Sequence, residues 1–244
     1  MLRIGAASRT INGEIGAFIQ GASVDNRAKS VRDDLEANAL YLADDPESVL
    51  LVSCDLVGLS PEHVGPVREA MGRAAGVPAR NVIVAGTHMH SGPSVIPTNP
   101  LKPLDSAYLD RLHGWLFDLG AEAAQTARPG RVAWGMGAAR IGYNRRCCWA
   151  DGAHTMHGDP ARPDFTGLEG PDDPAHFALF ARDADGKLIA VLYSNTSHPT
   201  CFYGADFYSA DFPGAARLFL RQALAPVPVL FFNGAFGDIS IESQ

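Results

Sequence analysis

The sequence of 244 residues is short of cysteine, of clustered positive charge and of long apolar runs. Its four cysteines include no Cys-x-x-Cys pair, so we expect reduced thiols rather than a framework of disulfides. Lysine and arginine number 20 against 27 for aspartate and glutamate, and the resulting net charge of −7 argues against binding to nucleic acid. No apolar run approaches the roughly 18 residues of a membrane-spanning helix, so no membrane span is predicted.

The first residues, 1–13, also lack a secretion signal, because no apolar stretch of about seven residues follows a basic start. A cytoplasmic location is therefore expected. Apolar residues make up 46% of the chain and charged residues 19%, which is enough apolar material for a sizeable core. The composition thus predicts a folded globular protein and excludes the disordered and fibrous classes.

Short apolar runs alternate with helical patterns along the chain. Strands are predicted at 49–54, 81–86, 131–136 and 227–233, and helices at 61–75, 105–127 and 210–223. The runs 177–182 and 188–195 flank a turn sequence that suits a β-hairpin. This alternation predicts an α/β fold: a single domain with a mixed, largely parallel sheet flanked by helices, in which the hairpin is the antiparallel part.

The segment from Cys147 to Ala175 is different. It is dense in Gly, Pro, Asp and His, shows little periodicity, and carries no predicted element. At about 29 residues it is long for a connection within a compact domain, which indicates either a functional loop or a mobile one. No internal repeat or linker is visible, so residues 1–244 are expected to form one domain.

Polar groups follow three predicted strands at the point where each strand ends. His88 and His90 follow the strand 81–86, and two histidines at i and i+2 of an extended chain can reach one centre. His198 follows the second hairpin strand, and Ser240 lies in a glycine-rich turn after the last strand. Each of these residues alone could equally be a hydrogen-bonded residue of a turn. Because all three strand ends carry such polar groups, the pattern indicates a site at one edge of the sheet.

Two arginines, Arg145 and Arg146, follow the predicted strand 131–136. Either guanidinium could hold a carboxylate or a substrate oxygen. The alternative is a solvated surface pair, and the residues alone favour that alternative.

Taken in order, five segments resemble the motif series of the neutral, non-lysosomal ceramidase family: GTHMHSGP, YNRR, SHPT, SADFPG and NGAFGDIS. Enzymes of that family are zinc amidases that cleave the N-acyl bond of ceramide. The resemblance implies Zn²⁺ as the cofactor, with His88 and His198 as zinc ligands. It also implies that His90 lines the pocket beside the metal and the scissile carbonyl. Arg145 would match the active-site arginine of the family, and Ser240 a serine that the family needs for activity.

The chemistry of these residue types agrees with the resemblance. Zn²⁺ accepts neutral imidazole nitrogen and, with one position open, lowers the pKa of its water to about 7. That water can attack an amide carbonyl, and His90 could carry a proton to the leaving amine. Ser240 could be a nucleophile or a hydrogen-bonding group, and the lack of a visibly paired base favours hydrogen bonding.

The pattern of the family continues beyond this sequence. Two further zinc ligands, a Glu and a Tyr, lie downstream of the Gly-Asp-x-Ser segment in the family, whereas this sequence ends at Gln244. Residues 1–244 are therefore expected to form a ceramidase-like N-terminal α/β domain that is partial relative to the family. Apolar surface of this domain that the further part of the family's fold would cover is expected to be exposed. Such a surface would favour a homo-oligomer.

Three functional hypotheses remain. The first is a zinc-dependent hydrolase of an N-acyl amide, either N-acylsphingosine, which belongs to sphingolipid metabolism, or a smaller N-acyl amine. The second is a catalytically incomplete α/β remnant or binding module. The third is a metal hydrolase of the amidohydrolase-barrel type, which places its His-x-His motif on the first strand, whereas here a third of the chain precedes it.

Overall fold

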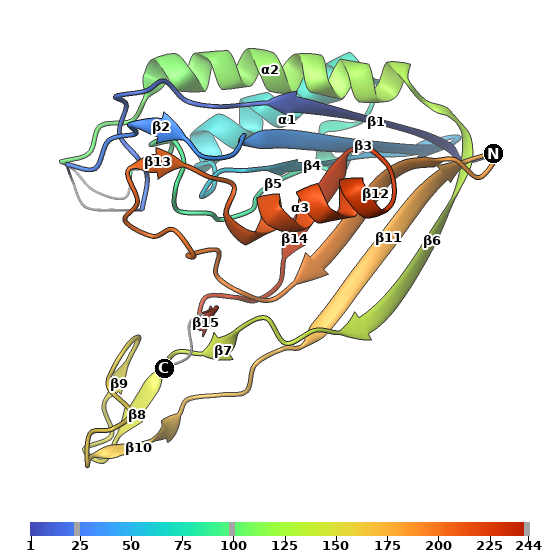
Figure 1. Cartoon of the computed structure of the whole chain (residues 1–244). Helices are drawn as coiled ribbons and strands as arrows, with labels where there is room; N and C mark the ends of the chain where they lie inside the picture. The colour runs from blue at the N-terminus through green and yellow to red at the C-terminus, as the bar shows by residue number, and fades with distance from the viewer. Residues whose placement is uncertain (22–24, 98–100, 242–244) are drawn as a thin grey trace.

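The computed structural model of the chain describes residues 1–21, 25–97 and 101–241, and an eight-stranded sheet lies at its centre (Figure 1). The sheet has the strand order β14-β12-β11-β6-β1-β3-β4-β5. Its strands are β1 (Arg3–Thr10), β3 (Glu36–Asp44), β4 (Glu47–Cys54), β5 (Val82–Gly86), β6 (Arg128–Ala138), β11 (Ala175–Asp183), β12 (Leu188–Asn195) and β14 (Val229–Asn233). The helices are α1 (Pro61–Ala75), α2 (Ser106–Gln125) and α3 (Asp211–Ala223), with a 3₁₀ turn at Ala79–Asn81.

The α/β class and the mixed sheet are confirmed, but the prediction that the sheet is largely parallel is wrong. Only β12 with β14 and β4 with β5 run parallel, and the other five neighbouring pairs of this sheet are antiparallel. Two strands that the pattern missed, β1 and β3, account for most of the difference. The segment that forms β1, RIGAASRT, has few large apolar residues, so it gives little periodic signal. A mostly antiparallel sheet is also incompatible with the parallel barrel of the third hypothesis.

The polar segment 147–175 also departs from its prediction, because it forms a small sheet of its own. The three strands are β8 (Cys147–Trp149), β9 (His154–Thr155) and β10 (Phe165–Leu168), in the order β10-β8-β9. The indole N–H of Trp149 donates to Thr155 Oγ1 at 2.9 Å, and its ring packs edge-on against Phe165. Strands of two to four residues are too short for a pattern of alternation to reveal them.

The large sheet folds over on itself, so that its two ends lie one above the other. One cluster of buried side chains from both ends fills the space between them: Ile4, Leu40, Ala181, Ile189, Ala190 and Leu230. A direct contact joins the two halves as well, since the Ser53 hydroxyl on β4 donates to the Phe231 carbonyl on β14 at 2.7 Å. The edge strand β14 therefore lies against β3 and β4 although it is far from them in strand order.

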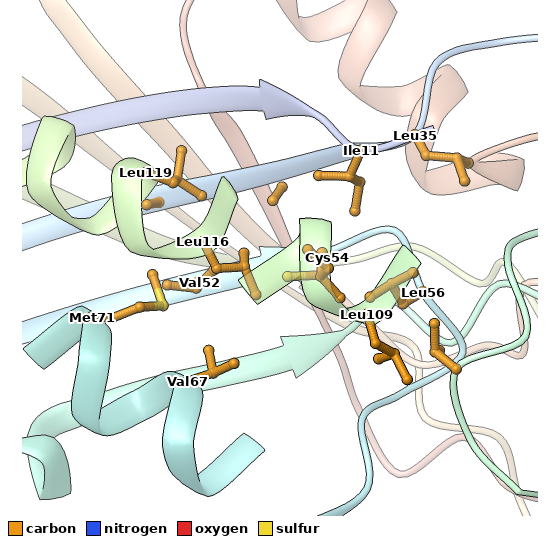
Figure 2. Close-up of a cluster of buried hydrophobic side chains, with 14 of the residues drawn as sticks. Ile11, Leu35, Val52, Cys54, Leu56, Val67, Met71, Leu109, Leu116 and Leu119 are labelled. Atoms are coloured by element: carbon orange, nitrogen blue, oxygen red, sulfur yellow. The ribbon is translucent and has the colours of Figure 1, made fainter. Parts of the chain in front are cut away.

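Helices cover the outer surface of β4 in one half and of β12 and β14 in the other. On β4, Leu50, Val52 and Cys54 face α1 and α2, where they pack with Met71, Leu116 and Leu119 (Figure 2). On the other half, β12 and β14 pack against Phe212 and Leu220 of α3. Burying each such large apolar side chain contributes about 1.5–3 kcal/mol. Alternate residues of β4 and β14 pack into two different cores, so both faces of these strands are largely apolar. Their sequences are therefore continuous apolar runs.

Among the residues that the structure describes, the outer surface of β6 and β11 is exposed. Trp134 is 74% exposed and Met136 68%, with Phe177 beside Met136 across the strand pair. This apolar strip is the surface on which the expected homo-oligomer would depend, and self-association stays a prediction. In the described part of the chain, no helix has the length and apolar character needed to cross a membrane.

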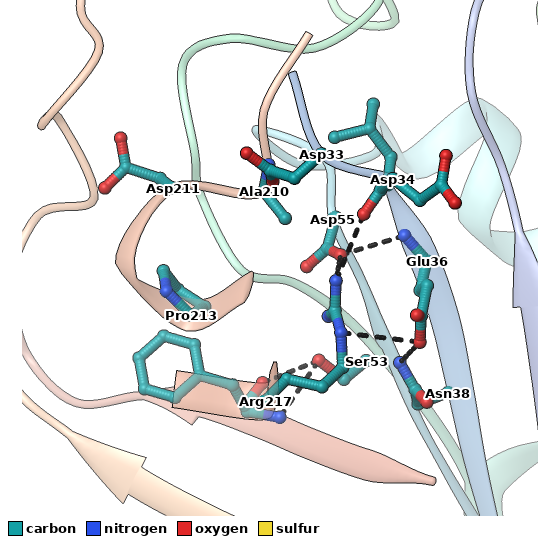
Figure 3. A network of polar contacts seen from close by, with 12 residues as sticks. Asp33, Asp34, Glu36, Asn38, Ser53, Asp55, Ala210, Asp211, Pro213 and Arg217 are labelled. Atoms are coloured by element: carbon teal, nitrogen blue, oxygen red, sulfur yellow. Dashed lines mark hydrogen bonds and ion pairs between the residues drawn. The ribbon is translucent and has the colours of Figure 1, made fainter. Parts of the chain in front are cut away.

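A buried charge network links α3 to the ends of β3 and β4 (Figure 3). Arg217 lies 2.8 Å from the Asp55 carboxylate and 3.4 Å from that of Glu36, while Asp55 also accepts the backbone N–H of Glu36 at 2.8 Å. Arg221 completes the group by contacting Glu36 at 2.7 Å. Burial raises the pKa of Asp55, and the contact with Arg217 opposes that rise. Removing the arginine would leave a buried carboxylate without its cation.

We predict that Arg217→Met lowers the free energy of unfolding by about 3–5 kcal/mol, measured by urea denaturation. The loss should be larger at about pH 7 than at about pH 5. Without Arg217 the pKa of Asp55 rises further above its unfolded value, so the folded state favours the neutral acid and loses stability as pH rises. Leu218→Ala is the control, because Leu218 is 55% exposed on the same helix. Equal losses in the two variants would contradict a role for the buried charge.

Candidate functional site

Three histidines from two distant strand ends meet in one cluster. His88 and His90 follow β5, and His198 follows β12. Their ring centroids lie 4.7–5.0 Å apart, and one nitrogen from each ring falls within 4.8 Å of the others. The fold-over of the sheet produces this meeting, since β5 is an edge strand and β12 lies next to the opposite edge.

The route by which His88 and His90 converge is not the one that the sequence suggests. His88 has a φ of 70°, in the left-handed region, so the chain turns at this residue instead of continuing as a strand. Its backbone N–H donates to the Leu56 carbonyl at 2.9 Å, which holds the turn against the loop after β4. A non-glycine residue held in this conformation is often found at a functional site.

The hydrogen bond of His88 defines its tautomer. Its Nδ1 lies 2.7 Å from the Val57 carbonyl, which can only accept, so Nδ1 carries the proton. The Nε2 atom then keeps its lone pair for a ligand. A backbone carbonyl in this position is a common partner of metal-binding histidines.

Burial keeps all three imidazoles neutral at about pH 7. It lowers the pKa of His88, that of His90 to about 4 and that of His198 to about 3. The positive charge of Arg145 and the neighbouring imidazoles lower these values further. Neutral imidazole is the form that binds zinc, so the residues present fit this ion.

Arg145 is held beside His198 by the backbone of the Gly-Asp-Ile-Ser segment. Its Nη2 donates to the Gly237 carbonyl at 2.7 Å and lies 3.2 Å from Nδ1 of His198. Its backbone N–H donates to the Asp238 carbonyl at 2.8 Å. Arg146 instead forms an ion pair with Glu169. Of the two candidate arginines, only Arg145 therefore contacts the histidine cluster.

Ser240 reaches the same place through a short strand pair. β15 (Ile239–Ser240) pairs antiparallel with β7 (Tyr143–Asn144), and the His198 N–H donates to the Ile239 carbonyl at 3.0 Å. Ser240 is buried and borders a cavity of about 510 Å³. The walls of the cavity are formed by His90, Arg145, His157, His198, Thr200, Cys201, Tyr203 and Ser240.

Several residues at this site were not indicated by the sequence. The Tyr203 ring lies 5.7 Å from that of His90 and is 62% exposed at the cavity wall. Gly21 approaches from the N-terminal region, where a Cβ would fall 2.4 Å from His90 Nδ1. Val57 contributes only a backbone carbonyl, which no side-chain pattern can indicate. Contacts of this kind depend on how distant loops fold together.

The fold is shared with neutral ceramidases. A ceramidase complexed with C2 superposes with a TM-score of 0.79 at 21% sequence identity, over 98% of this chain and 38% of that one. The neutral ceramidase of Pseudomonas aeruginosa gives a TM-score of 0.76 at 20% identity, over 98% of this chain and 39% of that one. This chain has the ceramidase fold. It spans under two fifths of the length of either protein, and no family model and no curated protein matches its sequence.

We predict that Arg145→Met raises the pKa of His198 in the metal-free chain from about 3 toward its ordinary value, because a positive charge beside the ring is removed. An NMR titration of the imidazole resonances measures this shift. Arg146→Met is the matched control, since its guanidinium pairs with Glu169. A similar shift in both variants, or none in either, would contradict the electrostatic role of Arg145.

Proposed function

We propose that residues 1–244 form the N-terminal α/β domain of a zinc-dependent hydrolase that cleaves an N-acyl amide bond. The observation that carries the proposal is the convergence of three neutral imidazoles with Arg145, where His90, His198 and Arg145 line a cavity. The shared fold supports the same reaction class, because similar chains of this fold are ceramidases.

His88 and His198 would hold the metal in this proposal. The Val57 carbonyl fixes the His88 ring, and the Ile239 carbonyl fixes the backbone of His198. Zinc held by these residues would supply Lewis-acid chemistry, activating water near neutral pH and polarising an amide carbonyl.

The other residues of the cavity would handle charge and protons. His90 is neutral in the resting site, so it can accept a proton and pass it to the leaving amine. The Arg145 guanidinium would stabilise negative charge that develops on the carbonyl oxygen. The Ser240 hydroxyl would orient the substrate by hydrogen bonding.

The cavity bears on the substrate class. A volume of about 510 Å³ accommodates an amide with short substituents, within the range of about 300–1,000 Å³ typical of ligand sites. A long alkyl chain would have to extend out of the cavity. Both N-acylsphingosine and a smaller N-acyl amine fit this description. Measuring hydrolysis of amides with a series of acyl lengths would distinguish the two substrates.

A second function is a binding module without catalysis. It rests on the histidine cluster alone, in which one nitrogen of each ring lies within 4.8 Å of the others. In that case the three histidines would bind a zinc ion, and hydrolysis of an amide would depend on other residues.

The first test is the zinc content of the purified chain. We expect about one zinc per chain by elemental analysis, lost in His88→Ala and in His198→Ala. His63→Ala is the control, because His63 lies on α1 next to His113 and away from the cluster. Zinc at background level in the wild type, or unchanged in both cluster variants, would overturn the metal site.

Amine release from N-acyl amides of increasing chain length then separates the two functions. Release that falls at least about tenfold in His90→Ala, with zinc retained, supports the hydrolase. Zinc binding without release supports the binding module.

A further inference from the structure

The Arg145 guanidinium beside the histidine cluster has no anionic partner. Among the described residues it forms no ion pair, whereas its neighbour Arg146 pairs with Glu169. Its Nη2 atom contacts neutral groups, the Gly237 carbonyl at 2.7 Å and Nδ1 of His198 at 3.2 Å. Partial burial lowers the pKa of Arg145, because the charged form loses contact with water. A partly buried cation without an anion is costly, so it indicates a place where an anionic ligand binds.

Two acidic side chains near this cavity are engaged elsewhere. Asp238 favours the charged form of Arg145, but its carboxylate accepts a hydrogen bond from Asn144 Nδ2 at 3.0 Å. Asp211 contacts the thiol of Cys201 at the cavity wall and accepts two backbone N–H groups. Neither carboxylate forms an ion pair with the guanidinium.

The cavity beside Arg145 combines positive charge with hydrogen-bond donors. Its walls, as the described residues form them, include no aspartate or glutamate. They do include three residues with hydroxyl groups, Thr200, Tyr203 and Ser240, and the imidazole of His157. The neutral rings of the histidine cluster add no negative charge. The charges and donors of this cavity are therefore complementary to an anion.

We propose that the cavity binds amides that carry a carboxylate, with Arg145 as the residue that holds this group, and that its substrates are N-acyl amino acids. The proposal rests on the proposed function, of which it names the substrate class. A guanidinium and a carboxylate are both planar and form paired hydrogen bonds. Hydrolysis of such an amide consumes one water and gives a carboxylic acid and a free amino acid.

The place of Arg145 suits a small ligand of this kind. In an N-acyl amino acid, only the amide nitrogen and the α-carbon separate the carboxylate from the amide carbonyl. Because Arg145 contacts the ring of His198, one such ligand can reach both the guanidinium and the histidine cluster. The guanidinium has several N–H donors, so binding the carboxylate is compatible with a contact to the carbonyl oxygen.

N-acylsphingosine would use the same cavity differently. It is the amide of an amino alcohol and carries no charge, so Arg145 would stay without an anion in its complex. A ligand that leaves a partly buried cation unpaired loses affinity relative to one that pairs with it. Charge, rather than the length of the acyl chain, therefore distinguishes the two substrate classes.

The test compares N-acetylleucine with N-acetylleucinol, in which a hydroxymethyl group replaces the carboxylate. Isothermal titration calorimetry measures the Kd of each ligand for the full chain, once with zinc added and once after removal of metal by EDTA. We expect N-acetylleucine to bind at least about tenfold more tightly in both forms. A preference in the metal-free form does not come from coordination of the carboxylate by zinc. The preference should shrink as the salt concentration rises, because salt screens the attraction.

Variants assign the preference to one guanidinium. Arg145→Met should reduce the difference between the two ligands to less than about twofold. Arg145→Lys keeps the charge but not the paired donors, so it should retain part of the preference. Arg146→Met is the matched control and should leave the preference unchanged, because that guanidinium pairs with Glu169.

Equal affinities in the wild-type chain, tighter binding of N-acetylleucinol, or no binding of either ligand would overturn the proposal. So would a preference for N-acetylleucine that persists in Arg145→Met, or one that is seen only with zinc. If Arg145→Met does not fold, the two ligands on the wild-type chain still decide the outcome. Amine release tests the hydrolase separately. Equal release from both ligands would support the hydrolase and contradict the preference for a carboxylate, whereas selective binding of N-acetylleucine without release would do the reverse.

Discussion

The packing of the two halves of the large sheet against each other is the constraint on which the rest of the structure depends. Buried side chains from both halves, among them Leu40 and Leu230, fill the space between them, and Ser53 joins β4 to β14 by a hydrogen bond. This packing brings the end of β5 next to the end of β12. Without it, His88 and His198 would lie at opposite sides of an open sheet.

Burial then sets the chemistry of the site. The same exclusion of water that stabilises the fold disfavours charge on the three imidazoles and lowers their pKa values. Arg145 remains a cation, because its guanidinium donates to the Gly237 carbonyl and its ordinary pKa is far above neutrality. A neutral ligand set beside a fixed positive charge suits a reaction in which negative charge develops on an oxygen.

Polar contacts between side chains that are separated in the sequence occur at two other places in the fold. Arg217 contacts the buried carboxylate of Asp55 and the partly buried one of Glu36, and so links α3 to the ends of β3 and β4. On the small sheet, His154 contacts both a carboxylate and a thiol. In each case the two partners come from different segments of the chain. The likeness to ceramidases at 20–21% identity shows that this arrangement of elements persists when most residues differ.

The sequence by itself determined the helices, the hairpin 177–195 and the strand ends that carry His88 and His198, because these depend on local periodicity and turn residues. Ser240 was expected in a turn, whereas it lies in the short strand β15, which pairs with β7. The sequence did not determine the pairing of the strands. Short or weakly apolar strands such as β1 and β8 carry no local signal, and strand direction depends on partners distant in the chain. Only the tertiary structure decided that the sheet folds over, that His88 turns at a positive φ, and that Arg145 rather than Arg146 reaches the histidines. These outcomes follow from packing and from hydrogen bonds to backbone carbonyls, which no pattern of side chains records.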